Sequence, residues 1–393
     1  MATVNKKFRV LVVDDSSFMR KVLEGIFNAD EQLQVVGNAK DGLEAVEMAE
    51  SLKPDVITMD INMPHVDGLQ ATAEIMTTNP KPIVIVSSES REGAASTLRA
   101  LELGAIEFVA KPSSAIDLDM QSVKEELLRK VRMAAKVRVV RTASRLALSI
   151  QNANGPKTST PSPASVRQAP TSGIDQRFPV VVLAASTGGP ATVMRIAPGF
   201  TADFPAAVIL VQHMPATFTT QYAAQLADFT GIRVKEAEAN ESLQPGTLYI
   251  CPGGQHLRVT PTGRIQLDGA SGRIAGYLPN IDVTMESVAA FAGPLGIAGI
   301  LTGMGNDGAN GAKAIKAAGG LVLAQDEATS IFMPPSKSAF WEFAPRLPQE
   351  FADASGGPSQ AKFSEDGTDH SLPRQRTTVR RLLRFSPGSP QRG

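Results

Sequence analysis

An apolar run that ends abruptly in a serine constrains this chain more than any other feature. Residues 180–185 read Val-Val-Val-Leu-Ala-Ala, and Ser186-Thr187-Gly188-Gly189-Pro190 follow directly. A short continuous apolar run bounded by small turn residues is typical of a buried strand, and Gly-Gly-Pro favours a turn and then the first turn of a helix. Open α/β sheets bind ligands at the carboxyl ends of their strands. The pattern therefore predicts a site at the Ser186 hydroxyl.

The chain is long enough for two cores, since it has 393 residues. Short apolar runs alternate with helical spacing over residues 8–112, which predicts βαβ units and a parallel sheet. A second region of this kind begins near Phe178. We predict four parts. The first is an α/β domain over 1–118. The second, over 119–177, is one long helix (119–150) followed by a Pro/Ser/Thr-rich linker (151–177). A second α/β domain over 178–347 and an irregular, disordered tail over 348–393 follow.

Composition points to the cytoplasm. Cys251 is the only cysteine, which excludes an intramolecular disulfide and a cysteine-based zinc site and favours a reducing compartment. The first residues are polar and lead straight into an apolar run, so no secretory signal is expected, and no apolar stretch is long enough for a membrane span. The formal net charge of zero gives no global attraction to nucleic acid or to a membrane surface.

Charged side chains follow the apolar runs of the first domain. Asp14 and Asp15 follow the first run, Asp60 the third, Ser87 the fourth and Lys111 the fifth. In a parallel sheet these positions share one edge, where three carboxylates would repel one another without a cation. Mg²⁺ prefers such oxygen ligands and leaves room for phosphoryl oxygens. The pattern predicts a Mg²⁺-assisted phosphoryl transfer to Asp60, with Lys111 and Ser87 contacting the phosphoryl group; the alternative, solvated acidic loops, is less favoured for all five together.

These motifs resemble the receiver domain of two-component response regulators. The similarity covers about residues 8–118, and its motifs are Asp14-Asp15-Ser16, residues 59–64 (Met-Asp-Ile-Asn-Met-Pro), Asp67-Gly68 and Lys111-Pro112. The resemblance implies a flavodoxin-like fold, phosphorylation of Asp60 by a histidine kinase, and the backbone carbonyl of Asn62 as a further Mg²⁺ ligand.

The second domain offers the parts of a serine hydrolase. Ser186 needs an adjacent base, His213 follows another apolar run, and Asp307 lies in a Gly-rich turn after a third. The order Ser, His, Asp and the missing Gly-x-Ser-x-Gly elbow do not exclude a triad, because geometry defines one. The turn at residues 303–308 could present the Met304 N–H to an oxyanion, or it could hold a phosphate at a helix N-terminus.

Other candidates in this domain have plainer interpretations. Of the four histidines, only His213 and His256 belong to it. His256 stands where a strand begins, and we assign it to structure or to substrate contact. Cys251 is interpreted as a small buried filler.

The motifs of the second domain resemble the protein-glutamate methylesterases of chemotaxis (CheB-type response regulators). The similarity spans about residues 180–332, in the segments 185–190, 212–215, 252–256 and 301–308. It implies a second doubly wound, mostly parallel α/β hydrolase domain that needs no cofactor. It further implies Ser186 as nucleophile, His213 as base, Asp307 as its orienting acid, and Thr187 with the Met304 backbone as oxyanion support. The implied substrates are glutamate γ-methyl esters on chemoreceptor helices, with deamidation of receptor glutamines as a second activity.

The similarity weakens after Ile331. Residues 332–335 keep only the Met-Pro of the family's Gly-Met-Pro segment. An altered reading frame near residue 332 and an unusual tail are the two explanations.

The receiver and linker also predict regulation. We expect the unphosphorylated receiver to cover the cleft around Ser186, and phosphorylation of Asp60 to draw Ser87 and Phe108 inward and loosen the contact. The alternative to this regulated esterase is a non-enzymatic response regulator whose second domain binds a nucleotide or a protein partner. DNA binding is disfavoured, because no helix-turn-helix pattern or basic domain is present.

Overall fold

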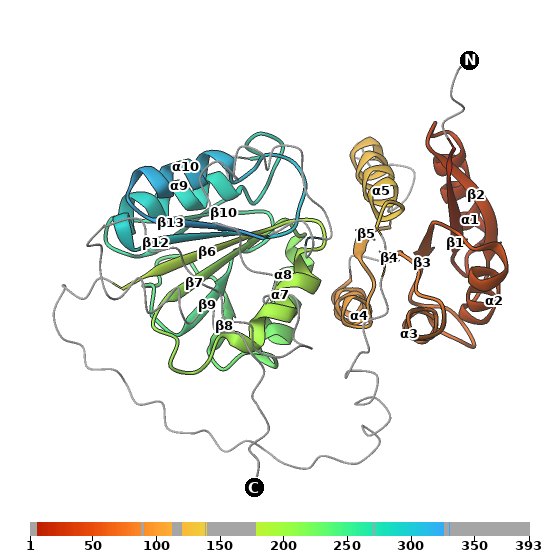
Figure 1. The fold of residues 1–393 in the computed structure, drawn as a ribbon, viewed down its shortest axis with the longest axis horizontal. Coiled ribbons are helices and arrows are strands. Elements are labelled where there is room, and N and C mark those ends of the chain that lie inside the picture. The colour runs from red at the N-terminus through yellow and green to blue at the C-terminus, as the bar shows by residue number, and fades with distance from the viewer. Residues whose placement is uncertain are drawn as a thin grey trace, which may run out of the picture.

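Two parallel sheets, each covered by helices, form the two domains of the protein (Figure 1). The structure is a computed structural model that describes residues 6–87, 90–111, 120–137, 139, 178–269, 272–325 and 330. The predicted linker, the predicted tail and the departure after Ile331 lie outside these residues. None of the helices in the described ranges is long and apolar enough to span a membrane.

The first domain has a five-stranded parallel sheet with the order β2-β1-β3-β4-β5. Its strands are β1 (Phe8–Val13), β2 (Leu33–Ala39), β3 (Val56–Met59), β4 (Ile83–Ser87) and β5 (Glu107–Ala110). Its helices are α1 (Ser17–Asn28), α2 (Gly42–Leu52), α3 (Gly68–Thr78), α4 (Arg91–Glu102) and α5 (Met120–Ala134). This strand order is that of flavodoxin-like folds, as predicted.

Both faces of the first sheet are buried. On β1, Val10 and Val12 pack in a cluster with α1 and α5 residues, whereas Leu11 and Val13 pack in another with residues of α2, α3 and α4. Alternate side chains of a strand point to opposite faces, so a strand with helices on both sides must be apolar throughout. This explains the continuous apolar runs in the sequence.

Helix α5 is shorter than predicted. It ends at Ala134, and hydrogen bonds from Lys136 N–H to Met133 and from Val137 N–H to Ala134 tighten the chain there. The prediction of one uninterrupted helix over 119–150 is therefore wrong. Leu127, Val131 and Ala134 are buried against the sheet and Ala135 is partly buried there, whereas Lys136 is exposed, so the packing that stabilises the helix stops just after Ala134.

The second domain has a six-stranded parallel sheet with the order β13-β12-β6-β7-β9-β8. Its strands are β6 (Val180–Ala185), β7 (Ala207–Gln212), β8 (Arg233–Glu236), β9 (Thr247–Ile250), β12 (Gly296–Ile300) and β13 (Leu321–Ala324), and β10 (His256–Val259) pairs with β11 (Ile265–Asp268) as an antiparallel hairpin. Its helices are α7 (Gly189–Ile196), α8 (Ala216–Ala227), α9 (Ile281–Ala292) and α10 (Ala309–Ala317), with short 3-10 turns at Ala197–Gly199 and Gly293–Leu295.

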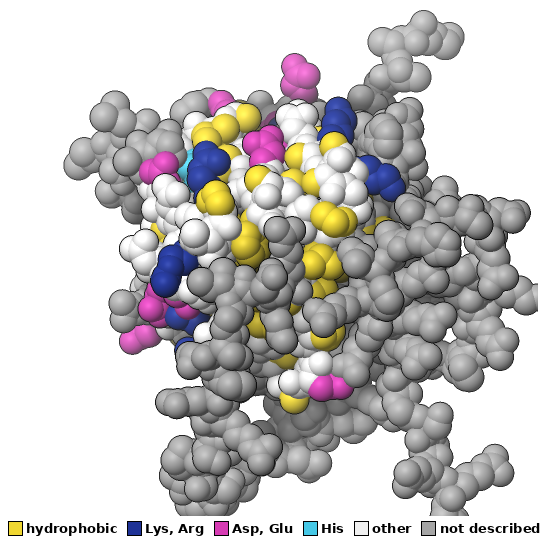
Figure 2. Space-filling model, turned by 90° about the vertical axis from the view of Figure 1, so that its left-hand side faces the viewer, with side chains coloured by type: hydrophobic (Ala, Val, Ile, Leu, Met, Phe, Trp, Pro, Cys, Tyr) yellow, Lys and Arg dark blue, Asp and Glu magenta, His cyan; other side chains and the backbone are white. Residues whose placement is uncertain are grey.

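The two faces of this sheet have different neighbours. Val180 and Val182 of β6 pack in a cluster with residues of α9 and α10, whereas Val181 and Leu183 belong to the cluster on the other face, with α7 and α8. Figure 1 shows α7 and α8 on the side toward the first domain, and α9 and α10 on the far side. On the described part of the face that Figure 2 presents, basic and acidic side chains are interspersed rather than separated by sign.

The strand order places a possible site at the middle of the second sheet. From β6 the chain crosses to β7 on one side, and it later returns to β12 on the other side of β6. The crevice outside the carboxyl ends of these strands is the topological switch point, where open α/β sheets bind ligands.

Candidate active site

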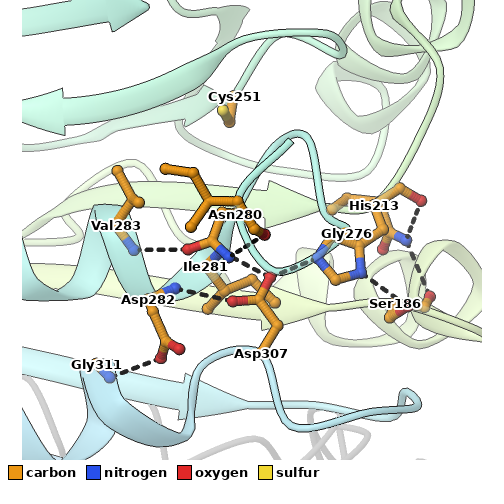
Figure 3. A network of polar contacts seen from close by, with 12 residues as sticks. Ser186, His213, Cys251, Gly276, Asn280, Ile281, Asp282, Val283, Asp307 and Gly311 are labelled. Carbon is orange, nitrogen blue, oxygen red and sulfur yellow. Dashed lines mark hydrogen bonds and ion pairs between the residues drawn. The ribbon is translucent and has the colours of Figure 1, made fainter. Parts of the chain in front are cut away.

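Three polar side chains from separate segments meet at this switch point (Figure 3). Ser186 follows β6, His213 follows β7, and Asp307 lies in the turn after β12. The Ser186 Oγ lies 3.1 Å from Nδ1 of His213, and Nε2 of the same ring lies 2.8 Å from Oδ2 of Asp307. The structure thus brings together the three residues predicted as a triad, although 27 and 94 residues separate the pairs in sequence.

The hydrogen bonds define how the imidazole works. A carboxylate can only accept, so Nε2 carries the hydrogen that is donated to Asp307. Nδ1 is then the lone-pair nitrogen, and the Ser186 hydroxyl donates to it. In this tautomer His213 is ready to take a proton from the serine.

Helix α9 holds the carboxylate of Asp307. The backbone N–H of Ile281 donates to Oδ2 at 2.9 Å and that of Asp282 to Oδ1 at 3.1 Å. Asn280 caps the same helix by accepting from the N–H of Val283. A helix N-terminus carries a positive partial charge and free N–H groups, so it stabilises an ionised carboxylate at this place.

Glycines allow the turns of the site to approach closely. A Cβ on Gly303 would lie 2.9 Å from the Cβ of Ser186, and one on Gly253 would lie 2.4 Å from the backbone nitrogen of Ala216, just after the His213 turn. A Cβ on Gly189 would lie 2.0 Å from Oε1 of Gln212. Gly residues at these three positions therefore let the separate turns pack around the Ser–His pair.

The oxyanion residues predicted from the sequence lie beside the nucleophile. Thr187 is buried next to Ser186, and its Oγ1 has no hydrogen-bond partner among the described residues. Met304 follows Gly303, whose Cα packs against Ser186. Buried hydroxyls are rarely left without a hydrogen bond, so this one calls for an explanation.

Sequence reasoning missed several residues that support the site. Gln212 donates from Nε2 to the carbonyls of Ser186 (2.9 Å) and His213 (3.2 Å), and the ring of Tyr277 stacks on that of His213. His256 is fully buried and holds a nearby loop, in line with the structural part of its interpretation. Cys251 is buried, which raises the pKa of its thiol far above the ordinary value and agrees with its interpretation as a filler.

The first domain packs against the face of the second domain that α7 and α8 cover. Phe108 of β5 stacks on Phe218 of α8 with ring centroids 4.5 Å apart, and Glu107 accepts at 3.2 Å from the N–H of Gly188, two residues after Ser186. At the other end of this contact, Arg129 of α5 donates to the Met304 sulfur at 3.0 Å. One apolar cluster runs through both domains. The interface therefore lies against the turns that carry Ser186 and Met304.

A charge cluster formed by buried Lys130 and Glu107 and by the more exposed Glu126 lies behind this interface. Lys130 lies 3.3 Å from Glu107 and 2.9 Å from Glu126, and it donates to the Phe108 carbonyl at 2.7 Å. Burial alone would lower the pKa of Lys130, but the charges of Glu107 and Glu126 outweigh it and raise that pKa. Lys130 therefore stays protonated, and its ion pair with Glu107 holds that carboxylate where it accepts from the Gly188 N–H.

The predicted acidic cluster forms at the carboxyl edge of the first sheet. Oxygens of Asp14, Asp15 and Asp60 lie within 4.8 Å of one another, and Nζ of Lys111 lies 2.9 Å from Asp14 and 2.8 Å from Asp60. Asp60 is almost fully buried, and burial raises the pKa of its carboxyl despite the opposing effect of Lys111. Three oxygen donors in this arrangement fit a hard divalent cation such as Mg²⁺.

The remaining predicted residues border this cluster. Ser87 is the last residue of β4, and its hydroxyl is buried with no hydrogen-bond partner among the described residues. Asn62 follows Asp60 by two positions, in the turn after β3.

Comparison with known proteins gives the same assignment for both domains. The CheB methylesterase family model matches residues 181–342, and the response regulator receiver domain model matches residues 10–122. The protein-glutamate methylesterase/protein-glutamine glutaminase of Pyrococcus horikoshii is 40% identical over 343 residues, which cover 86% of this chain and 89% of that protein. The protein of the same name from Symbiobacterium thermophilum is 43% identical over 331 residues, with coverages of 84% and 90%.

Solved structures include a similar chain for the second domain. The Thermotoga maritima CheB methylesterase catalytic domain is 36% identical, with a TM-score of 0.41, and the match covers 44% of this chain and 97% of that chain. Both resemblances inferred from the sequence motifs, and the fold class, are confirmed.

Asp60→Asn is expected to stabilise the protein at neutral pH in the absence of Mg²⁺. Because burial raises the pKa of Asp60 in the folded state, its ionisation costs stability as the pH rises above the unfolded value of about 4, and an asparagine avoids this cost. In buffer with a chelator, the midpoint of the first thermal transition of Asp60→Asn should lie a few degrees above the wild type at pH 7. The difference should vanish as the pH falls toward 4. A lower midpoint at pH 7 would mean that pairing with Lys111 outweighs burial.

Proposed function

Because the chain belongs to the family of CheB methylesterases, we propose that it is a phosphorylation-regulated serine hydrolase that demethylates glutamate γ-methyl esters of chemoreceptors and deamidates receptor glutamines. The observation that carries this proposal is the hydrogen-bonded chain from Ser186 through His213 to Asp307. The relatives are named as enzymes, which favours the hydrolase over a non-enzymatic binding domain.

The reaction begins at the Ser186 oxygen. His213 takes the hydroxyl proton on Nδ1 while Oγ attacks the γ-carbonyl carbon, and a tetrahedral oxyanion forms. As the intermediate collapses, His213 gives the proton to the leaving group, which departs as methanol from an ester or as ammonia from an amide. A water molecule that loses its proton to His213 then attacks the acyl-enzyme. The products are a glutamate carboxylate and the regenerated serine.

Two groups stabilise the charge that develops on the carbonyl oxygen. The proposed oxyanion donors are the Thr187 hydroxyl, which has no partner among the described residues, and the backbone N–H of Met304, which follows Gly303 beside Ser186. One such donor is worth about 10²–10³ in rate, because it is already oriented before charge develops. Asp307 meanwhile stabilises the imidazolium, and the α9 N-terminus keeps its carboxylate oriented.

Asp60 is the proposed phosphoryl acceptor, with a histidine kinase as donor. Asp14, Asp15, Asp60 and the Asn62 carbonyl would hold Mg²⁺, which neutralises charge on the transferred phosphoryl group. Lys111 already contacts Asp14 and Asp60, so it is placed to pair with the phosphoryl oxygens. The orphaned Ser87 hydroxyl is placed to donate to the same group.

We further propose that the receiver restrains the esterase until Asp60 is phosphorylated. The contacts of Glu107 with Gly188 and of Arg129 with Met304 place the receiver against the turns next to the nucleophile. A receptor helix needs the same space. Movement of Ser87 and Phe108 toward the phosphoryl group would remove the Phe108–Phe218 stack from this interface.

Ser186→Ala tests the proposed chemistry. The variant should lose at least about 10³-fold in methanol release from methylated receptor membranes, because Ser186 is the nucleophile that contacts His213 among the residues that the structure describes. Methanol is measured from receptors labelled in the methyl group. The control is phosphorylation of Asp60, which should remain at the wild-type level. Unchanged methanol release would remove Ser186 from the mechanism and favour the binding-module alternative.

The restraint is tested where α4 packs on α8, at residues that take no part in either proposed reaction. Gln225 of α8 donates to Glu102 of α4. Gln225→Glu would set two carboxylates face to face and weaken the closed arrangement by roughly 1 kcal/mol, so the methylesterase rate of the unphosphorylated chain should rise about fivefold.

The matched control for this variant is its combination with Glu102→Gln. The double variant restores a carboxylate–amide pair with the partners exchanged, and its basal rate should return toward the wild type. The rates of the phosphorylated forms should agree within about twofold. If Gln225→Glu leaves the basal rate unchanged, the closed arrangement does not limit the enzyme.

A further inference from the structure

Tyr277 lies against the imidazole of His213, although it has no role in the proposed reaction. The two ring centroids are 4.5 Å apart and the planes are inclined by only 15°. The His213 side chain is 16% exposed, so it is largely enclosed, and the phenol covers one of its faces. Its edge nitrogens remain directed at Ser186 and Asp307. Tyr277 thus contacts the base without competing for either hydrogen bond.

The loop that carries Tyr277 is fastened on both sides. The N–H and carbonyl groups of Ile274 and Tyr277 pair with each other at 3.0 Å. Buried His256 donates from Nε2 to the Gly272 carbonyl at 2.7 Å and accepts at Nδ1 from the Asn280 N–H at 3.1 Å. Asn280 also donates to the Ile274 carbonyl at 3.2 Å. His256 and Asn280 therefore fix the loop whose phenol ring covers His213.

The hydroxyl end of Tyr277 reaches the turn that carries Asp307. A Cβ on Gly305 would lie 2.1 Å from the phenol oxygen, and Gly305 has a φ of +84°. Only glycine leaves room for the ring at this place. The phenol therefore spans from His213 to the turn between Met304 and Asp307, and it restrains both parts of the site.

We propose that Tyr277 is a positioning residue. It keeps the His213 ring oriented so that its two nitrogens face Ser186 and Asp307, and it stabilises the imidazolium formed during catalysis. The inference rests on the proposed function, in which His213 receives the Ser186 proton. The face of an aromatic ring carries negative potential, so it attracts a cation stacked against it. The contact is therefore stronger when His213 is protonated than when it is neutral. Because the contact stabilises the transition state, in which His213 gains a proton, more than the resting enzyme, it lowers the barrier to serine attack.

Other charges near His213 are the same in every variant of the test. Asp307 contacts its Nε2, and Asp282 of α9 lies beside Asp307. From the receiver, Arg129 reaches Met304. On the Nδ1 side lies the Ser186 hydroxyl, and Glu107 of the receiver accepts from the N–H of Gly188, two residues further along the chain. A shift in pH dependence between variants at position 277 therefore reports on the ring alone.

The test compares three forms of the full chain, namely the wild type, Tyr277→Phe and a chain with pentafluorophenylalanine in place of Tyr277. Fluorination keeps the size of the ring but removes the negative potential of its face. Each form is phosphorylated with a small acyl phosphate and Mg²⁺. The rate at which a fluorophosphonate probe labels Ser186 is then measured across pH, together with methanol release from methylated receptors and the thermal midpoint.

An unfluorinated aromatic ring at position 277 should be enough for a near wild-type labelling rate. Tyr277→Phe should label within about twofold of the wild type, because it retains the aromatic face. The fluorinated chain should label about tenfold more slowly, and the midpoint of its acid limb should move about one pH unit lower, since a less stabilised imidazolium loses its proton more readily. The thermal midpoints of the phenylalanine and fluorinated chains should agree, which separates this effect from misfolding.

Several outcomes would overturn the inference. A fluorinated chain that matches Tyr277→Phe in rate and in midpoint shows that the ring face has no electrostatic role. A slower rate with an unchanged midpoint reduces the ring to packing, and a Tyr277→Phe chain as slow as the fluorinated one assigns the effect to the hydroxyl. If labelling shows the expected differences but no form releases methanol, the inference stands and the proposed substrate is wrong. A wild type that the probe does not label overturns both.

Discussion

The carboxylate of Asp307 at the N-terminus of α9 is the contact on which the candidate site depends. Two backbone N–H groups of the helix hold its oxygens, and the hydrogen bond from His213 then fixes the tautomer. Only this tautomer leaves Nδ1 free to accept the Ser186 proton. The α9 N-terminus is in turn fixed by the Asn280 cap and by His256. A backbone feature of one helix thus determines the tautomer of a side chain on another segment.

The sequence predicts which residues end the strands, but not which strands are neighbours. Ser186, His213 and Asp307 each follow an apolar run, and such runs are readable because both faces of the sheet are buried. Their meeting depends on β12 and β7 lying on the two sides of β6, which follows from long-range pairing. Tyr277 was missed because an aromatic residue in an irregular loop has no periodic signal. The long helix expected over 119–150 was wrong because charged helical spacing continues in the sequence beyond the last residue that packs.

A single short strand links the two functional sites. Lys111 directly follows β5 and contacts Asp60, while Glu107 and Phe108 at the start of the same strand contact Gly188 and Phe218. Lys111 at the proposed phosphoryl site thus lies only three positions after Phe108 at the interface with the second domain. Each residue of β5 is paired with β4, so under the proposed regulation a displacement at Lys111 would reach Phe108 through one short strand.

The partners of the buried charges explain how such an interface can open. Lys130 is paired with Glu107, Glu126 and the Phe108 carbonyl, all of which belong to the receiver. Separation of the domains would therefore leave no buried charge without a partner, which is the costly outcome when an ion pair is divided. The Gly188 N–H loses an acceptor that water can replace. Opening would expose the apolar surface around Phe108 and Phe218 to water, and this cost holds the domains together. Movement of Phe108 out of the interface would reduce that cost.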